Sequence, residues 1–103
     1  MAGKNFFALD LTANAVTDAH TVTATNDDSF AVNFCNRTND TVQVWLWISA
    51  TGTPTDAEAI LYGQLIYPLG SFERTGLIAQ NGKHVVVKAN AAGVSANGYG
   101  YEE

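Results

Sequence analysis

The sequence contains little that could form an active site or a metal centre. It has one cysteine, two prolines and two histidines among 103 residues. Cys35 cannot form an internal disulfide bond, which indicates synthesis in a reducing compartment. His20 and His84 lie far apart in the sequence, and neither belongs to a metal-binding spacing. We therefore expect no catalytic residue, no metal and no cofactor.

Positive charge is also scarce. Five Lys and Arg residues stand against ten Asp and Glu residues, which gives a net charge of -5. Without a basic cluster, the chain lacks the electrostatic footprint of nucleic-acid binding, and its acidic balance disfavours an anionic membrane surface. No apolar run approaches the roughly 20 residues of a spanning helix, and Asp10 interrupts the short apolar N-terminal stretch. We expect a soluble protein with no nucleic-acid partner and no membrane partner.

Short apolar segments alternate with clusters of turn-forming residues, and no longer segment has a helical apolar stripe. This pattern predicts an all-β fold, a single antiparallel β-sandwich of immunoglobulin-like or jelly-roll type with about eight strands. Residues 1–19 are expected to form an N-terminal strand or arm, and residues 20–103 the sandwich domain. The strand signals lie at residues 7–11, 22–24, 30–34, 41–49, 60–67, 72–79, 85–87 and 94–101.

Local signals also predict how some strands are arranged. The strand at 30–34 is followed directly by the strand at 41–49, so we expect these two to pair. Asn81-Gly82 predicts a type I′ hairpin that joins residues 77–79 to residues 85–87. Pro68 indicates that the strand before it lies at a sheet edge or ends there. Gly98 and Gly100 share one face of the last strand, which favours close approach of another sheet or chain.

The strand at residues 41–49 is apolar on both faces. Its valines, Leu46 and Ile48 alternate with Trp45 and Trp47, so the aliphatic side chains occupy one face and the indoles the other. A small antiparallel sheet normally leaves one face to water. Two indoles on the second face therefore suggest burial against another subunit or another part of the fold, and they favour assembly over catalysis.

Arg74 is the other unusual residue, because it lies within an apolar stretch beside Glu73. It can pair with a carboxylate across a subunit interface, where its planar fork favours bidentate contact, or form an ordinary exposed cross-strand ion pair. The residues that we expect at an intermolecular interface are Phe6, Phe7, Trp45, Trp47, Arg74, Tyr99 and Tyr101.

Several short phrases occur in a fixed order along the sequence. They are Cys35-Asn36-Arg37-Thr38, Thr53-Pro54-Thr55-Asp56-Ala57-Glu58, Phe72-Glu73-Arg74-Thr75-Gly76, Ala91-Ala92-Gly93-Val94-Ser95 and Tyr99-Gly100-Tyr101-Glu102-Glu103. Together they resemble a group of small virion structural proteins of tailed bacteriophages, over about residues 20 to 103. The resemblance implies a β-sandwich on the phage particle, either decorating the capsid or forming part of the tail, fibre or neck. It carries over no catalytic residue.

The leading hypothesis is a capsid decoration or cement protein that binds the major capsid protein or other virion proteins and stabilises the head shell. It would be made in the bacterial host cytoplasm, reside in the virion and form a homo-oligomer, for which we expect a trimer. The alternative is a tail, neck or fibre module that recognises host glycans through Trp45, Trp47 and the tyrosines. A small hydrolase or metal enzyme would need a polar cluster that the sequence does not show.

Overall fold

The computed structural model describes residues 2–23 and 27–102, and this part of the chain is almost entirely β-strand. The strand signal expected at residues 22–24 lies partly outside the described residues, and in its described part it is wrong, since residues 22 and 23 belong to no strand and the second strand ends at Thr21. The elements are β1 (Ala2–Asp10), β2 (Thr17–Thr21), β3 (Asp28–Asn36), β4 (Val42–Ser49), the 3-10 helix η1 (Asp56–Glu58), β5 (Ala59–Ile66), β6 (Ser71–Ala79), β7 (His84–Ala89) and β8 (Val94–Glu102). The predicted all-β fold is confirmed.

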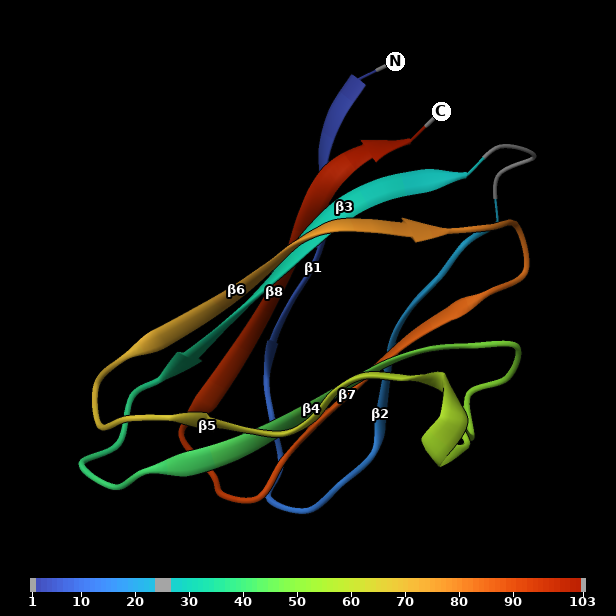
Figure 1. Cartoon of the computed structure of the whole chain (residues 1–103). Helices are drawn as coiled ribbons and strands as arrows, with labels where there is room; N and C mark the ends of the chain where they lie inside the picture. Colours follow the sequence, from blue (N-terminus) through green and yellow to red (C-terminus); the bar gives the residue numbers. More distant parts are fainter. Residues whose placement is uncertain (1, 24–26, 103) are drawn as a thin grey trace.

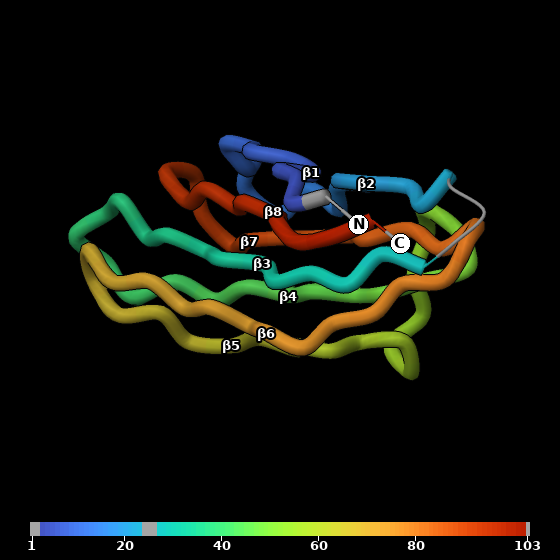
Figure 2. The backbone as a smooth tube through the Cα atoms, turned by 90° about the horizontal axis from the view of Figure 1, so that it is seen from above, coloured from blue at the N-terminus to red at the C-terminus, as the bar shows by residue number. Residues whose placement is uncertain are grey.

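The strands form two four-stranded antiparallel sheets packed face to face (Figures 1 and 2). We call the sheet with strand order β1-β8-β3-β6 the first sheet, and that with order β2-β7-β4-β5 the second sheet. Strand pairs 1–8, 2–7, 3–6 and 4–5 all form, as they do when one long hairpin of paired strands is wrapped over itself. This order is the jelly-roll topology, so the structure decides between the two expected types of sandwich.

Both local pairings expected from the sequence are wrong. β3 and β4 lie in different sheets, and so do β6 and β7. The Asn81-Gly82 turn crosses between the sheets, with a hydrogen bond from Lys83 N to Gln80 O of 3.0 Å and a positive φ of 86° at Gly82 but not at Asn81. That is a type II geometry instead of type I′. The alternation of apolar residues is the same whether two consecutive strands pair in a hairpin or lie in opposite sheets, because in both cases their apolar side chains face the same core.

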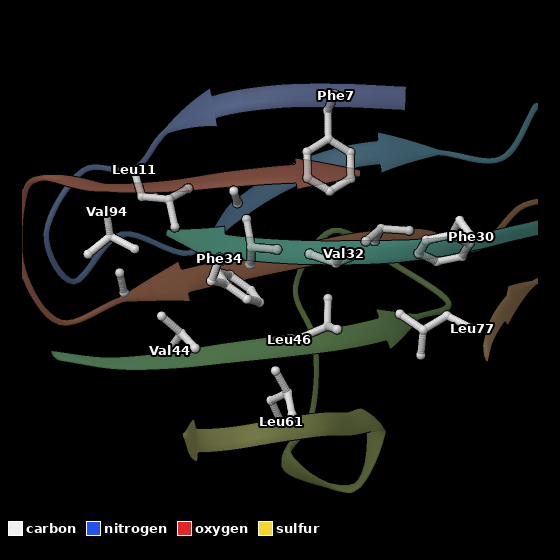
Figure 3. Packing of buried hydrophobic residues seen from close by; sticks show 14 of the residues in the cluster. Phe7, Leu11, Phe30, Val32, Phe34, Val44, Leu46, Leu61, Leu77 and Val94 are labelled. Atoms are coloured by element: carbon white, nitrogen blue, oxygen red, sulfur yellow. The ribbon is translucent and has the colours of Figure 1, made fainter. Parts of the chain in front are cut away.

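The core lies between the two sheets and is rich in valine (Figure 3). Phe34 and Leu46 are the largest of its fully buried side chains, one from each sheet. The inward residues of β4 are those expected from alternation, with Val42, Val44 and Leu46 completely enclosed. β-branched side chains suit this setting because they are stiff and pack well on a pleated surface.

The described part of residues 1–19 is built into the sandwich and does not form an arm. β1 pairs with β8 from Ala2 opposite Glu102 to Asp10 opposite Ser95. A bulge at Phe6 interrupts this ladder, and both phenylalanines pack within their own chain. Phe7 is buried in the core, and Phe6 stacks on His20 with ring centroids 4.8 Å apart. The burial of Phe7 in the core of its own chain corrects its assignment to an intermolecular interface, whereas the assignment of the half-buried Phe6 stays a prediction.

The close approach expected at the glycines of the last strand is confirmed. A Cβ at Gly98 would lie 2.3 Å from Cε1 of Phe7, and one at Gly100 would lie 2.2 Å from the carbonyl oxygen of Ser29. The first neighbour is a core ring that crosses β8, and the second is the backbone of β3.

Replacing Gly98 by alanine should lower the free energy of unfolding by about 1 to 3 kcal/mol, because the new methyl group displaces the buried Phe7 ring. Urea denaturation at fixed pH measures the change. Gly3→Ala is the matched control: its Cβ would be 3.7 Å from the nearest atom, and we expect a change below about 0.5 kcal/mol. Equal stability of the two variants would contradict the packing of Phe7 over β8.

Candidate functional site

The outer face of the second sheet is partly covered by the chain's own loop between β4 and β5. This loop, residues 50–58, reaches across β7 towards β2, since a Cβ at Gly52 would lie 3.1 Å from Oδ2 of Asp18. Val86 is fully buried on this face, and Trp47 is only 5% exposed. Trp47 also lines a hollow together with Gly52 and Pro54 of the loop. Another part of the same fold therefore shelters Trp47, and its assignment to an intermolecular interface is wrong.

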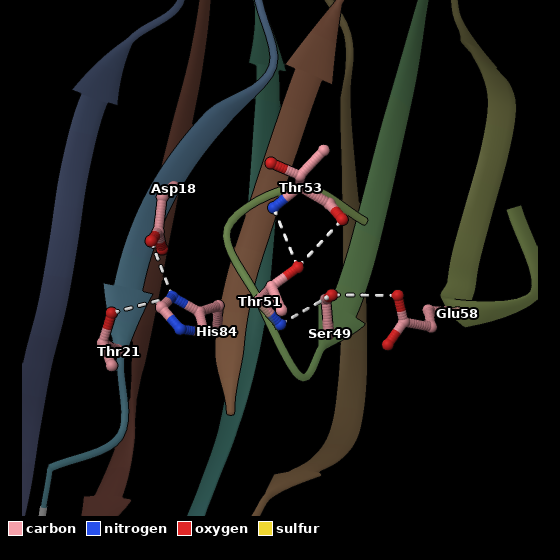
Figure 4. Close-up of polar contacts among 7 residues, drawn as sticks. All are labelled: Asp18, Thr21, Ser49, Thr51, Thr53, Glu58 and His84. Carbon is pink, nitrogen blue, oxygen red and sulfur yellow. Dashed lines mark hydrogen bonds and ion pairs between the residues drawn. The ribbon is translucent and has the colours of Figure 1, made fainter. Parts of the chain in front are cut away.

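Glu58 of η1 fastens this loop to the end of β4 (Figure 4). Its Oε1 accepts hydrogen bonds from Ser49 Oγ at 2.9 Å and from the Thr55 amide at 2.9 Å, and its Oε2 accepts one from the Ala50 amide at 3.1 Å. These hydrogen bonds lower the pKa of Glu58 from 4.5 to about 2. The amide of Thr55 makes the largest contribution, followed by the amide of Ala50 and the hydroxyl of Ser49. The ionised carboxylate thus holds the loop closed.

The two histidines form separate pairs with aspartates, and both pairs join strands. His84 Nδ1 of β7 lies 2.6 Å from Oδ2 of Asp18 and 3.1 Å from Oγ1 of Thr21, both on β2 (Figure 4). His20 Nε2 lies 2.8 Å from Oδ2 of the buried Asp28 and so links β2 of one sheet to β3 of the other. These contacts account for the histidines as ties within the sandwich.

The described residues contain no group of three or more His, Cys, Asp and Glu side chains that could hold a metal ion. No helix within residues 2–23 and 27–102 is long and apolar enough to cross a lipid bilayer.

Large apolar side chains are exposed along β5 and in the turn that follows it. We call this set the β5 patch: Ile60, Tyr62, Leu65, Tyr67 and Leu69, with exposed fractions between 38% and 72%. β5 is the outermost strand of the second sheet, so the patch lies at a free sheet edge. Exposed apolar surface at such an edge is typical of a protein contact site.

Trp45 extends the β5 patch onto β4. Its half-buried ring meets Tyr62 edge to face, with centroids 6.3 Å apart and an interplanar angle of 82°. The ammonium of Lys88 lies 4.5 Å from the centre of the indole, which is a cation–π contact. Of the two tryptophans expected at an intermolecular interface, Trp45 is the one whose ring is still accessible on the surface.

The turn at the end of the patch places a leucine where the backbone favours glycine. Residues 67–70 form a tight turn closed by a hydrogen bond from Gly70 N to Tyr67 O of 3.0 Å, with Pro68 at its second position. Leu69 at the third position has a φ of +59° and is 69% exposed. A bulky residue in this left-handed region costs about 1 to 3 kcal/mol. The isolated chain gains no burial of the leucine in return.

Asn36 holds this turn in place. Its buried side chain donates hydrogen bonds from Nδ2 to the carbonyl oxygens of Asp40, Ile66 and Tyr67, at 2.7, 3.1 and 3.1 Å. Its Oδ1 accepts from the amide and the hydroxyl of Thr38. The amide group thus ties the end of β3 and the crossing loop to the end of β5.

The other expected interface residues lie on the first sheet. Arg74 is exposed on the edge strand β6, and it takes part in none of the ion pairs that the described residues form. Tyr99 and Tyr101 are exposed on β8. Because Trp45 is on the second sheet, the indoles and the tyrosines cannot form one continuous glycan-binding surface.

The sequence interpretation missed the β5 patch as a site. The signal was present: residues 60–67 are apolar on both faces of a strand, and Pro68 indicates that this strand lies at a sheet edge or ends there. A strand that is apolar on both faces and has a free edge must expose apolar side chains unless a loop of the same chain or another chain covers them.

Comparisons with protein-family models, with curated proteins and with solved structures found no match.

Replacing Glu58 by glutamine should loosen loop 50–58 and expose Trp47, so acrylamide should quench the tryptophan fluorescence more strongly than in the wild type. Because the pKa of Glu58 is lowered in the folded state to about 2, its stabilising effect is complete above pH 4.5 and is lost as the pH falls towards 2. The stability difference between Glu58→Gln and wild type should shrink over that range.

Asp56→Asn is the control for this prediction, since Asp56 is an exposed acidic residue of the same helical turn. We expect it to leave the quenching unchanged. A stability difference for Glu58→Gln that stays constant between pH 4.5 and 2 would rule out the ionised carboxylate as the fastening group.

Proposed function

We propose that this protein is a non-enzymatic bacteriophage virion structural protein, made in the bacterial host cytoplasm, that decorates the capsid and stabilises the head shell. The β5 patch supports an assembly role because it offers aromatic and aliphatic side chains at a free sheet edge. The ordered phrases that resemble small virion proteins support the phage particle as the place of that assembly.

The strained leucine in the β5–β6 turn is the observation that carries this proposal. Leu69 costs stability in the isolated chain and has most of its side chain in solvent. Asn36 and Thr38 nevertheless fix the turn, since Asn36 N bonds to Gly70 O at 2.8 Å and Leu69 N to Thr38 O at 3.1 Å. Contact with another molecule accounts for a leucine that is held in this exposed position at a cost in stability.

The composition around the patch fits a protein partner. Residues 59–72 contain no charged side chain, although the chain as a whole is 15% charged. Cores of protein interfaces are depleted of charge and enriched in tyrosine. We propose the major capsid protein, or another virion protein, as the surface that covers the patch, with the protein bound as a homo-oligomer, expected to be a trimer.

Side-chain packing is a better route to this contact than strand addition. β5 carries two bulges, where Gly63 and Ile60 have no partner residue on β4. Bulges increase the local twist and interrupt a ladder, so the edge is poorly suited to a long added strand. The side chains of the patch, which point away from the sandwich, can still pack into a neighbouring surface.

A tail, neck or fibre module is the second candidate. The exposed tyrosines Tyr99 and Tyr101 favour it, because they form a separate surface on the first sheet that a particle contact through β5 leaves open. In that case the β5 patch would pack against a tail protein.

Replacing Leu69 by glycine should separate stability from binding. The isolated variant should be as stable as the wild type or more stable, by up to about 1 kcal/mol, because glycine relieves the positive φ. Binding to particles that lack the protein should weaken about tenfold or more, as measured by co-sedimentation.

Ile78→Ala is the matched control for Leu69→Gly. Ile78 is similarly exposed, at 61%, but belongs to β6 of the first sheet, so particle binding should stay unchanged. Unchanged binding of Leu69→Gly would remove the β5 patch from the contact.

Particles assembled without the protein should release their genome at a lower temperature and survive osmotic shock less well than complete particles. A reconstruction of complete particles should place the protein on the head with β5 against the shell. Equal resistance of both kinds of particle would defeat the cement role, and density at the tail would support the second candidate.

A further inference from the structure

A shallow trough crosses the outer face of the first sheet. It has a volume of about 670 Å³, and its floor and walls come from all four strands of that sheet. The residues that shape it are Tyr99 and Tyr101 of β8, Gly3 of β1, Ser29 and Ala31 of β3, and Gly76 of β6.

Small neighbours leave the tyrosine rings accessible. Tyr101 lies between Gly3 and Ser29 in the sheet register, and Tyr99 lies between Asn5 and Ala31. A Cβ at Gly3 would be 3.7 Å from Cε1 of Tyr101, so the Tyr101 ring lies close to Gly3, which has no side chain to cover it. Tyr101 is 51% exposed and Tyr99 38%. The rings project from one strand, about 7 Å apart.

The far end of the trough is opened by a bulge in β6. The register between β3 and β6 shifts between Phe30 and Val32, so that Thr75 and Gly76 both face Ala31. Gly76 has a φ of +71°, and a Cβ built on it would meet no atom within 4 Å. The absence of side-chain bulk at Gly76 therefore extends the trough across the whole sheet.

The chemistry of the trough favours a neutral ligand. Among the described residues that line it, Lys4 alone is charged, and its Nζ lies 3.1 Å from Oε2 of Glu102 and is thus compensated. The remaining polar groups are short, an amide at Asn5, a hydroxyl at Ser29 and the two phenols. A sugar ring has an apolar face of C–H groups bordered by hydroxyls, and it matches open aromatic faces that are flanked by small donors and acceptors.

We propose that this trough binds a neutral oligosaccharide, with successive hexose rings stacked on Tyr101 and Tyr99. This function goes beyond attachment to a particle. The trough lies on the outer face of the first sheet and the β5 patch on the edge of the second, so a protein docked through β5 keeps the trough open to the medium. Glycan binding does not require the particle and can be tested on the isolated chain.

The test is a titration of the isotope-labelled protein with maltohexaose, cellohexaose, mannohexaose and N-acetylated chitohexaose, followed by NMR. At least one of these sugars should give saturable shifts, centred on the backbone amides of Gly3, Asn5, Ala31 and Gly76. Tyr101→Ala should weaken that binding about tenfold. Tyr101→Phe, which keeps the ring face, should stay within about threefold of wild type.

Tyr62→Ala is the control, because Tyr62 of β5 is an exposed tyrosine, 64% against 51% for Tyr101; it should bind the sugar as the wild type does. The thermal midpoint of each variant verifies folding, which truncation of these surface rings should preserve. No saturable shift with any sugar, shifts centred on Trp45, or wild-type affinity of Tyr101→Ala would each overturn the proposal. Leu69→Gly should bind sugar normally, so loss of particle binding and loss of glycan binding are distinguishable.

Discussion

The position of the β5 patch depends on one buried amide, the side chain of Asn36. In a jelly roll the chain leaves one sheet at the end of β3 and enters the other at β4, so the backbone at this crossing has no ladder partner. Unpaired buried carbonyl groups are costly. Asn36 donates to the carbonyl oxygen of Asp40 within this crossing and to those of Ile66 and Tyr67 at the end of β5, and it accepts from Thr38. The same bonds that complete the crossing also fix the turn that bears Leu69.

This role gives a physical reason for one of the phrases in the sequence. Asn36 and Thr38 lie in an Asn-Arg-Thr triplet, which also matches a glycosylation signal, yet the asparagine is fully buried and its amide is fully engaged. The triplet is therefore a structural turn. Its neighbour Arg37 forms an ion pair with Asp10 and its amide bonds to Gly93 O, so the turn also touches the end of β1 and the β7–β8 connection.

Alternation of apolar residues was enough to predict most of the strands and the two-layer fold, because each depends on local periodicity, but it did not predict β2 at Thr17–Thr21. Pro68 indicated either an edge position or a strand end, and β5 both lies at the edge of its sheet and ends just before this proline. Alternation could not predict pairing, since Leu77 and Val85 face the same core whether β6 and β7 pair or cross between sheets. The sequence also could not show that a loop of the same chain covers Trp47. A strand that is apolar on both faces has the same pattern whether a loop or a second subunit covers it. The trough depends on what surrounds Tyr101 across strands, which no local pattern contains.

The place of β8 has a consequence for how the molecule reaches its native state. β8 lies between β1 and β3 and supplies the ladder partner of both, so the first sheet cannot close until residues 94–102 have left the ribosome. Pairing between remote segments makes folding slow and leaves unpaired strands exposed meanwhile. Newly made chains therefore present open edges, β1 and β3 among them, until β8 has paired with both. Dilution or chaperone capture during synthesis would then govern the yield of native protein more than the stability of the finished sandwich does.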